Sequence, residues 1–168
     1  ETVPFLTNET IFALREAPSH LIILGGGPIG MEMAQAHRRL GVPVTVIEAA
    51  RALGREDPEL AALVLANLRA EGVEVLEDAP AVQIAGEAGA IAVTLKEGRV
   101  IHGSHLLVAT GRRVAVERLD LAAAGVEATP RGVTVGADLR SVSNRRVYAI
   151  GDAAGGAQFT HLAGYHAG

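Results

Sequence analysis

The sequence contains no cysteine and no tryptophan, and only five of its 168 residues are aromatic. The absence of cysteine excludes disulfide bonds, thiolate metal sites and any thiol–disulfide chemistry carried by this chain. A single lysine accompanies 14 arginines, and the net charge is −4, with basic and acidic residues mixed along the chain. Because no basic stripe is present, we predict neither a nucleic acid nor a membrane as a partner.

Long apolar runs are missing as well. No run reaches the ~18 residues that a membrane span needs. The first residues, ETVPFLTNET, lack the basic start and the apolar stretch of a signal peptide. These features favour a cytoplasmic location. The chain starts at Glu1 without a methionine and stops in mid-pattern at Gly168, so we expect it to be part of a longer protein.

Glycine, in contrast, is plentiful and patterned. In residues 21–34, LIILGGGPIGMEMA, an apolar run precedes Gly25, Gly27 and Gly30, and helix-forming residues follow. This order predicts a strand, a turn that cradles phosphate and the N-terminus of a helix. Gly25 suits a tight turn, Gly27 lets backbone approach a pyrophosphate, and Gly30 lets the helix lie close to the strand. Pro28 fits the first helical turn, where its missing N–H costs nothing.

A glycine-rich turn alone could be an ordinary turn, so its context matters. The β-branched run 42–47 follows, and Glu48 closes it 48 − 30 = 18 residues after Gly30. A carboxylate there can accept hydrogen bonds from the adenosine ribose of a bound NAD, although it could also be a solvated charge. Because Glu48 would repel the 2′-phosphate of NADP, NADH is favoured over NADPH. Arg51 and Arg55 weaken this preference, since either could bind a phosphate.

The remaining pattern predicts an α/β fold. Helices over 28–40 and 58–71 alternate with strands at 21–24, 42–47 and 73–76, giving a Rossmann-like parallel sheet with right-handed crossovers. From residue 82 the apolar period changes to two, which predicts an antiparallel three-stranded β-meander in place of a crossover helix. Further strands are predicted at 105–109, 133–135 and 147–150, and a short helix at 7–14. The apolar stripe of the second helix is predicted to consist of Leu60, Leu63, Val64 and Leu68.

Three motifs occur in a fixed order: GGGPIGMEMA from Gly25, ATGRR from Ala109 and YAIGDAAGG from Tyr148. With them, essentially the whole chain resembles the flavin-dependent pyridine nucleotide-disulfide oxidoreductases, the group of dihydrolipoamide dehydrogenase, glutathione reductase and mercuric reductase. REDPEL at Arg55 and the ending AQFTHLAGYHAG are most similar to mercuric reductase-like and dihydrolipoamide dehydrogenase-like members.

The resemblance implies a set of residues that contact the pyridine nucleotide. Glu48 would hold the adenosine ribose, Glu32 would lie near the nicotinamide, Val82 would border the adenine, and Gly111 would approach the nucleotide from the crevice edge. Glu32 could instead be a first-turn carboxylate favoured by the helix dipole. The residues implied to hold the pyrophosphate are Gly25, Gly27, Pro28, Ile29 and Gly30.

A second set is implied to lie near FAD. Gly151 and Asp152 match the family's second flavin motif, in which the aspartate binds the ribityl chain. Asp152 could alternatively be an ordinary helix N-cap. Thr160 and His161 would lie near the flavin by the same resemblance.

The resemblance also implies the domain organisation. Residues 1–18 form a lead-in segment, 19–112 the NAD(P)-binding Rossmann-like domain, and 113–168 a partial return to the flavin-binding domain. The family's N-terminal flavin motif, redox cysteine pair and C-terminal dimer domain are missing. We therefore expect the isolated chain not to turn over, and its parent to bind FAD and to form a homodimer. We assign no catalytic residue to this chain.

The predicted function is to bind the nucleotide in an enzyme that transfers hydride from NADH to flavin and on to a disulfide or metal-ion acceptor. One alternative is a stand-alone, non-catalytic dinucleotide-binding or redox-sensing module. Another is an S-adenosylmethionine-dependent transferase, which the meander and the Gly151-Asp152 pair disfavour. The spacings of His102 with His105 and of His161 with His166 do not suit a metal site.

Overall fold

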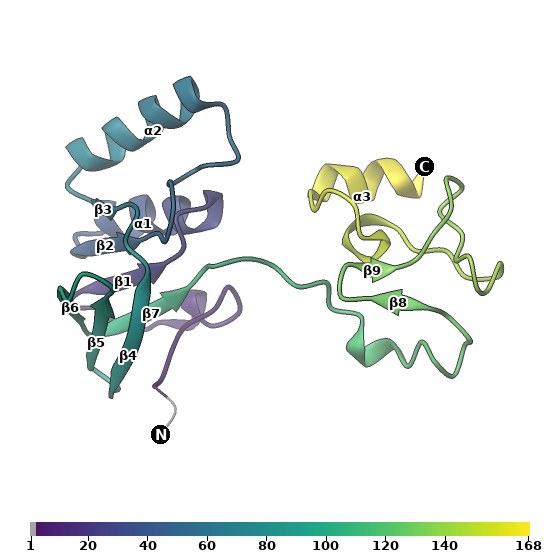
Figure 1. Ribbon diagram of the computed structural model, residues 1–168, viewed down its shortest axis with the longest axis horizontal. Coiled ribbons are helices and arrows are strands. Elements are labelled where there is room, and N and C mark those ends of the chain that lie inside the picture. The colour runs from purple at the N-terminus through teal and green to yellow at the C-terminus, as the bar shows by residue number, and fades with distance from the viewer. Residues whose placement is uncertain (1–2) are drawn as a thin grey trace. The chain divides into compact units, whose positions relative to one another are not determined.

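The computed structural model describes residues 3–168, which fall into two compact units that divide between Gly111 and Arg112 (Figure 1). The first unit holds the predicted α/β elements up to the strand at 105–109. Its elements are the 3-10 helix η1 (Ile11–Ala13), β1 (Leu21–Leu24), α1 (Pro28–Arg39), β2 (Val44–Ile47), α2 (Pro58–Ala70), β3 (Glu74–Leu76), β4 (Ala81–Glu87), β5 (Ala90–Leu95), β6 (Val100–Gly103) and β7 (His105–Val108).

Four strands form a parallel sheet in the order β3-β2-β1-β7. Leu24, at the end of β1, lies opposite both Ile47 and Val108, so the carboxyl ends of the central strands are level. The chain first builds outward from β1 to β2 and β3, and it then returns to the other side of β1 as β7. In open α/β sheets, ligands bind beyond the carboxyl ends of the strands at such a reversal of strand order.

The parallel sheet is covered on both faces, which explains its continuous apolar strands. Leu21 and Ile23 of β1 pack in one core with α1 and α2, while Ile22 and Leu24 pack in another with the antiparallel sheet β4-β5-β6. Figure 1 shows the helices and the meander on opposite sides of the parallel strands. The predicted fold class, a Rossmann-like parallel sheet with a β-meander crossover, is confirmed.

The predicted apolar face of α2 is wrong in part. The residues that α2 buries are Ala61, Leu65 and Leu68, which follow the helical spacing of i, i+4 and i+7. Leu60 and Leu63 are more than 60% exposed. The sequence offers apolar residues around most of the helix, so periodicity alone could not choose between the two faces. The predicted start is confirmed, because the Asp57 side chain accepts hydrogen bonds from the first turn.

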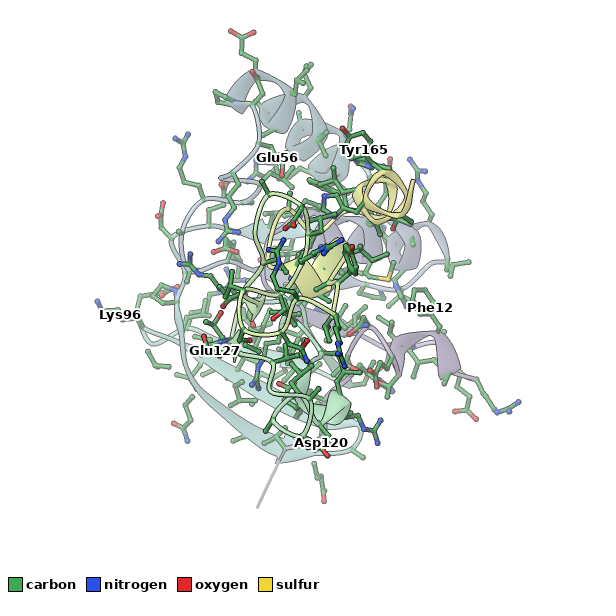
Figure 2. All side chains as sticks on the ribbon, turned by 90° about the vertical axis from the view of Figure 1, so that its right-hand side faces the viewer. Phe12, Glu56, Lys96, Asp120, Glu127 and Tyr165 are labelled. Atoms are coloured by element: carbon green, nitrogen blue, oxygen red, sulfur yellow. The ribbon has the colours of Figure 1, made fainter. Side chains whose placement is uncertain are left out.

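The lead-in segment is less regular than predicted. In place of a helix over 7–14 there is one 3-10 turn, η1, in which Ile11 alone is buried. Phe12 is 77% exposed and points away from the rest of the first unit (Figure 2). One apolar anchor is too little to hold several helical turns. Ahead of η1, Leu6 makes a parallel bridge to Leu107 of β7 and extends the sheet edge.

The second unit has little regular structure. Its elements are η2 (Glu117–Leu119), β8 (Ala128–Thr129), β9 (Gly132–Val133), η3 (Gly151–Ala154) and α3 (Thr160–Ala167). The predicted strand at 133–135 is shorter than expected, and the one at 147–150 is wrong, since it makes only a bridge from Tyr148 to Arg140. A strand depends on hydrogen-bonding partners that its own residues cannot specify.

Among residues 3–168, no helix combines the length and the apolar character that crossing a membrane requires.

Candidate functional site

The glycine turn lies where three strand ends meet. Gly25 has φ +106°, a conformation that glycine tolerates best, and its N–H donates a 2.9 Å hydrogen bond to the carbonyl of Ile47 on β2. A Cβ added to Gly25 would overlap the backbone carbonyl of Ala109, which follows β7. The turn is therefore possible only because this position carries no side chain.

Gly30 and Gly27 have different surroundings. A Cβ on Gly30 would overlap the carbonyl oxygen of Gly25, so α1 lies tightly against the turn. Gly27 is the N-cap of α1, and a Cβ added there would meet nothing within 4 Å. As the N-cap, Gly27 directly precedes the first turn of α1, where the backbone N–H groups have no partner within the helix. This open cradle at a helix N-terminus suits a phosphate group.

A carboxylate stands beside the cradle. One oxygen of Glu48 accepts a 2.7 Å hydrogen bond from Gly26 N–H, and the other accepts one of 3.0 Å from Ala50 N–H. An ionised carboxylate has about four acceptor positions, so Glu48 can accept further hydrogen bonds. Because both oxygens are held by backbone, the carboxylate has a defined orientation before any ligand arrives.

Gly26 is a site residue that the sequence analysis missed. A Cβ there would lie 2.9 Å from Cβ of Glu48 and 3.2 Å from Cα of Ala52. Its carbonyl accepts a 2.8 Å hydrogen bond from Leu53 N–H. The run of three consecutive glycines was the available signal, but the motif spacing uses only the first and the third of them, Gly25 and Gly27.

The other residues of the implied nucleotide set lie at different points of the first unit. Ile29 is 37% exposed in the first turn of α1. Glu32 is exposed but lies past the first turn, so its alternative reading as a first-turn carboxylate is wrong. Val82 is 60% exposed at a register shift in β4, and Gly111, which ends the first unit, has no atoms near its missing Cβ.

The implied flavin set lies in the second unit. Asp152 is inside η3, its side chain caps no helix, and its carboxylate lies 3.9 Å from the Arg112 guanidinium. The N-cap interpretation of Asp152 is therefore wrong. Gly151 N–H donates a 3.1 Å hydrogen bond to Nδ1 of His166 in α3. Thr160 begins α3, and the ring of His161 stacks on Phe159 at 5.3 Å.

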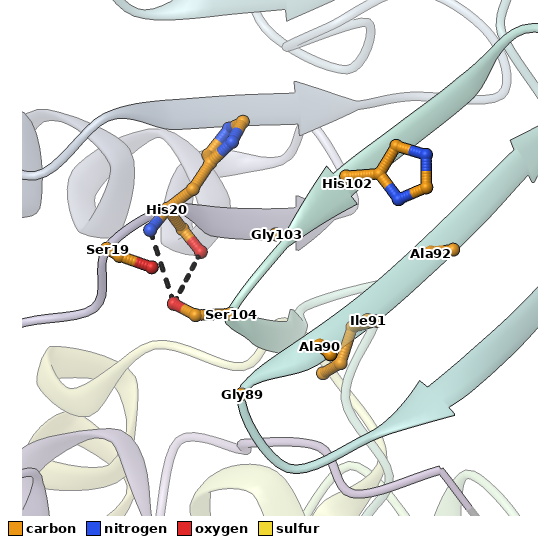
Figure 3. A pocket seen from close by; sticks show the side chains of 9 residues that line it. All are labelled: Ser19, His20, Gly89, Ala90, Ile91, Ala92, His102, Gly103 and Ser104. Carbon is orange, nitrogen blue, oxygen red and sulfur yellow. Dashed lines mark hydrogen bonds between the residues drawn. The ribbon is translucent and has the colours of Figure 1, made fainter.

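A hollow of about 360 Å³ lies at the opposite edge of the sheet (Figure 3). Ser19 and His20 precede β1, and Ser104 precedes β7, so this hollow is at the amino ends of the strands. Figure 3 shows the Ser104 hydroxyl bridging the backbone N–H and carbonyl of His20. The Ser104 hydroxyl and the His20 backbone groups are thus used within the fold, and the hollow lies at the other end of β1 from the glycine turn. We regard the glycine turn as the candidate site.

In the part of the chain that the structure describes, no three histidine, aspartate or glutamate side chains gather as a metal site would require.

Comparison with known proteins decides the family. The family model described as pyridine nucleotide-disulphide oxidoreductase matches residues 1–167. The chain belongs to this family. It is 37% identical over 169 residues to a mercuric reductase of Streptomyces lividans, covering 99% of this chain and 36% of that protein. A dihydrolipoyl dehydrogenase of Bacillus subtilis is 36% identical over 167 residues, covering 97% of this chain and 36% of the relative.

Solved structures agree with the sequence comparison. The HOCl-induced flavoprotein disulfide reductase RclA from Escherichia coli superimposes with a TM-score of 0.88 at 32% identity, covering 96% of this chain and 38% of that one. LpdA from Mycobacterium tuberculosis gives a TM-score of 0.84 at 29% identity, covering 96% and 35%. The chain spans about a third of the length of the curated relatives that it matches. Its family consists of flavin- and pyridine nucleotide-dependent oxidoreductases.

Proposed function

We propose that this chain is the pyridine nucleotide-binding part of a flavoprotein NAD(P)H oxidoreductase. Residues 19–112 bind NADH, and residues 113–168 contribute to the flavin domain of a homodimeric parent protein. The observation that carries this proposal is the open cradle at Gly27 beside the oriented carboxylate of Glu48. Family membership supports the same type of cofactor.

The pyrophosphate is held at the start of α1. Gly27 leaves room for it, while Pro28 and Ile29 form the first turn of the helix. The unpaired N–H groups and the positive end of the helix dipole favour a negatively charged group at this position. Gly25 and Gly30 take part indirectly, because without their small size the turn and the helix could not approach each other.

The adenosine ribose binds to Glu48. The carboxylate accepts from Gly26 and Ala50 and keeps capacity for two ribose hydroxyls. A 2′-phosphate in place of the hydroxyl would meet this negative charge, which supports NADH over NADPH. Arg51 and Arg55 are exposed in the following loop and are the groups through which NADPH could still bind.

The remaining contacts follow the family pattern. Bound NADH would supply a hydride to a flavin, and the reduced flavin would supply the two electrons to a disulfide or metal-ion acceptor. The contribution of this chain is to bind and orient, which is the usual protein share in cofactor chemistry. Glu32 faces the nicotinamide, Val82 borders the adenine, and Gly111 approaches the nucleotide. On the flavin side the residues are Gly151, Asp152, Thr160 and His161.

The test is a titration of the intact protein with NADH and NADPH, using Glu48→Gln and, as a matched control, Glu56→Gln. Glu56 is an exposed glutamate of the same connection. Glu48→Gln is expected to weaken NADH binding about tenfold, as for a lost hydrogen bond to a charged group. It should also reduce the difference in affinity between NADH and NADPH. Glu56→Gln should bind like the wild type.

Each outcome has a distinct meaning. If the wild type binds neither nucleotide, the proposed function is overturned. Equal or tighter binding of NADPH overturns only the preference for NADH. A purified protein that binds NADH but shows no flavin absorbance would favour the stand-alone dinucleotide-binding module.

A further inference from the structure

The connection between β2 and α2 holds the glycine turn from two sides. Gly26 N–H donates to Glu48 at 2.7 Å, and Leu53 N–H donates to the Gly26 carbonyl at 2.8 Å. Both backbone polar groups of Gly26 are therefore fixed by this one connection. Any change in its conformation would move Gly26 and Glu48 together.

The connection has an unfavourable conformation of its own. Leu53 has φ +52°, in the left-handed region that residues with a Cβ seldom occupy. It is nevertheless buried, as is Ala52, and both pack into the core between the sheet and its helices. Such a conformation persists only where the surrounding structure holds it in place.

Glu77, which follows β3, is hydrogen-bonded to this connection. One of its carboxylate oxygens accepts a 3.0 Å hydrogen bond from Ala52 N–H. The other accepts one of 2.7 Å from the Arg69 guanidinium of α2. A second backbone bond, 2.8 Å from Asp78 N–H to the Ala50 carbonyl, lies beside it. The end of β3 is thus bonded to the connection, and the connection is bonded to the glycine turn.

Glu77 is a charged acceptor at neutral pH. The hydrogen bond from Arg69 is the main cause that lowers the pKa of its carboxyl, burial opposes it, and the Ala52 N–H lowers it further. Hydrogen bonds to ionised groups are stronger than those between neutral groups. The ion pair itself is partly exposed, with side-chain exposures of 45% and 27%, so its own share in stability is small.

We propose that Glu77 is a positioning residue of the nucleotide site. The hydrogen bond from Ala52 to Glu77 maintains the neighbouring hydrogen bond from Leu53 N–H to the Gly26 carbonyl. The Gly26 N–H in turn keeps the Glu48 carboxylate in the orientation that accepts the ribose. This inference rests on the proposed function, because it assigns to Glu77 a role in binding the same nucleotide. Losing that bond lowers the fraction of molecules with a competent site, and the apparent affinity falls by the same factor.

Four variants of the intact protein separate the hydrogen bond from other effects. Glu77→Ala removes the acceptor, and Glu77→Asp keeps the charge but withdraws it by one methylene. Glu77→Gln keeps an oxygen acceptor for Ala52. Glu71→Ala is the matched control, because Glu71 makes an equally short 2.7 Å pair with Arg39 without touching the connection.

The measurements are the dissociation constants of NADH and NADPH, the midpoint of thermal unfolding and hydrogen exchange of the Leu53 amide. Glu77→Ala and Glu77→Asp are expected to weaken NADH binding about five- to tenfold and to speed exchange at Leu53. Glu77→Gln should bind NADH within about threefold of the wild-type affinity, and Glu71→Ala should bind it like the wild type.

Several results would overturn the inference without touching the proposed function. If the wild type binds NADH and Glu77→Asp binds it equally well, Glu77 does not position the site. If Glu77→Gln loses as much affinity as Glu77→Ala, charge and not the Ala52 hydrogen bond is responsible. Should Glu77→Ala fail to fold, the comparison of Glu77→Asp with Glu77→Gln still decides. A wild type that binds neither nucleotide contradicts the proposed function itself.

Discussion

The Thr45 hydroxyl on β2 donates a 2.9 Å hydrogen bond to the carboxylate of Glu74 on β3. Thr45 is 1% exposed and also lies 2.9 Å from Nε2 of His20, which precedes β1. Since a hydroxyl has one proton and gives it to Glu74, His20 must be the donor in the second contact. Arg99 closes the row with a 2.6 Å ion pair to Glu74. These groups connect three neighbouring strands near the amino edge of the sheet.

Thr45→Val should destabilise the first unit by about 1–3 kcal/mol, because it leaves His20 without a partner and takes one donor from Glu74. The shape of the side chain is kept, so the loss reports the hydroxyl. Urea denaturation gives the free energy of unfolding. Thr94→Val, at a half-buried threonine of β5, is the control and should change it by less than about 0.5 kcal/mol. Equal effects of both substitutions would contradict the role assigned to Thr45.

Acidification should weaken the same row of side chains. Burial raises the pKa of the Glu74 carboxyl, but hydrogen bonds from Arg99 and Thr45 and the charges of Arg99 and His20 outweigh it, leaving the pKa below its ordinary value of 4.5. A lowered folded pKa adds stability above the ordinary value, and this stability is lost as the pH falls through the folded value.

Glu74→Gln should therefore lower the free energy of unfolding more at neutral pH than in acid. Chemical denaturation at several values between about pH 7 and pH 3 measures the difference between wild type and variant, which is expected to shrink below the ordinary glutamate pKa. A difference that stays constant across this range would contradict the prediction.

Substitution by alanine should affect stability strongly at Gly25 and only weakly at Gly27. Gly25→Ala should cost more than about 2 kcal/mol of stability, because it combines a positive φ with an overlap at Ala109. Gly27→Ala should cost less than about 1 kcal/mol, since its Cβ meets nothing and the N-cap backbone is extended. The added methyl group of Gly27→Ala should nevertheless weaken NADH binding. Urea denaturation and NADH titration give both values, and normal NADH binding by Gly27→Ala would count against the cradle.

The α2 helix carries one buried and one exposed leucine that can be compared directly. Leu65 is 7% exposed and Leu63 is 64% exposed on the same helix. Leu65→Ala should cost about 2–5 kcal/mol by opening a cavity in the core, whereas Leu63→Ala should change stability by less than about 0.5 kcal/mol. Thermal and urea unfolding of the two variants measure this, and similar losses from both would mean that the buried face is assigned wrongly.

Much of the first unit was predictable because its signals are local. The strand–glycine–helix order around Gly25 and the period change at residue 82 each act over a few residues, and the structure confirms the elements they predict. The rule that parallel crossovers are right-handed then predicts the hand of the connections from β1 to β2 and from β2 to β3. The buried face of α2 was not predictable, because apolar residues occur around most of the helix and periodicity does not single out one face.

The misses concern relations between distant residues. Nothing local shows that Gly26 donates to Glu48, that Leu53 takes a left-handed conformation, or that Glu77 reaches Ala52. These contacts arise only when β1, β2 and β3 lie side by side. The second unit was predicted least well for the same reason: the apolar run 147–150 signals a strand, but a strand also requires a neighbour.

The contact between Gly25 and Ala109 also has a kinetic meaning. The two residues are 109 − 25 = 84 positions apart, so the turn acquires its final shape only after β7 has paired with β1. Closing so long a loop costs entropy that is recovered only once the distant strand is in place. A chain emerging from the ribosome therefore contains the glycine motif long before the turn has its final shape, and a ligand that binds this turn can stabilise only a first unit in which β7 has docked.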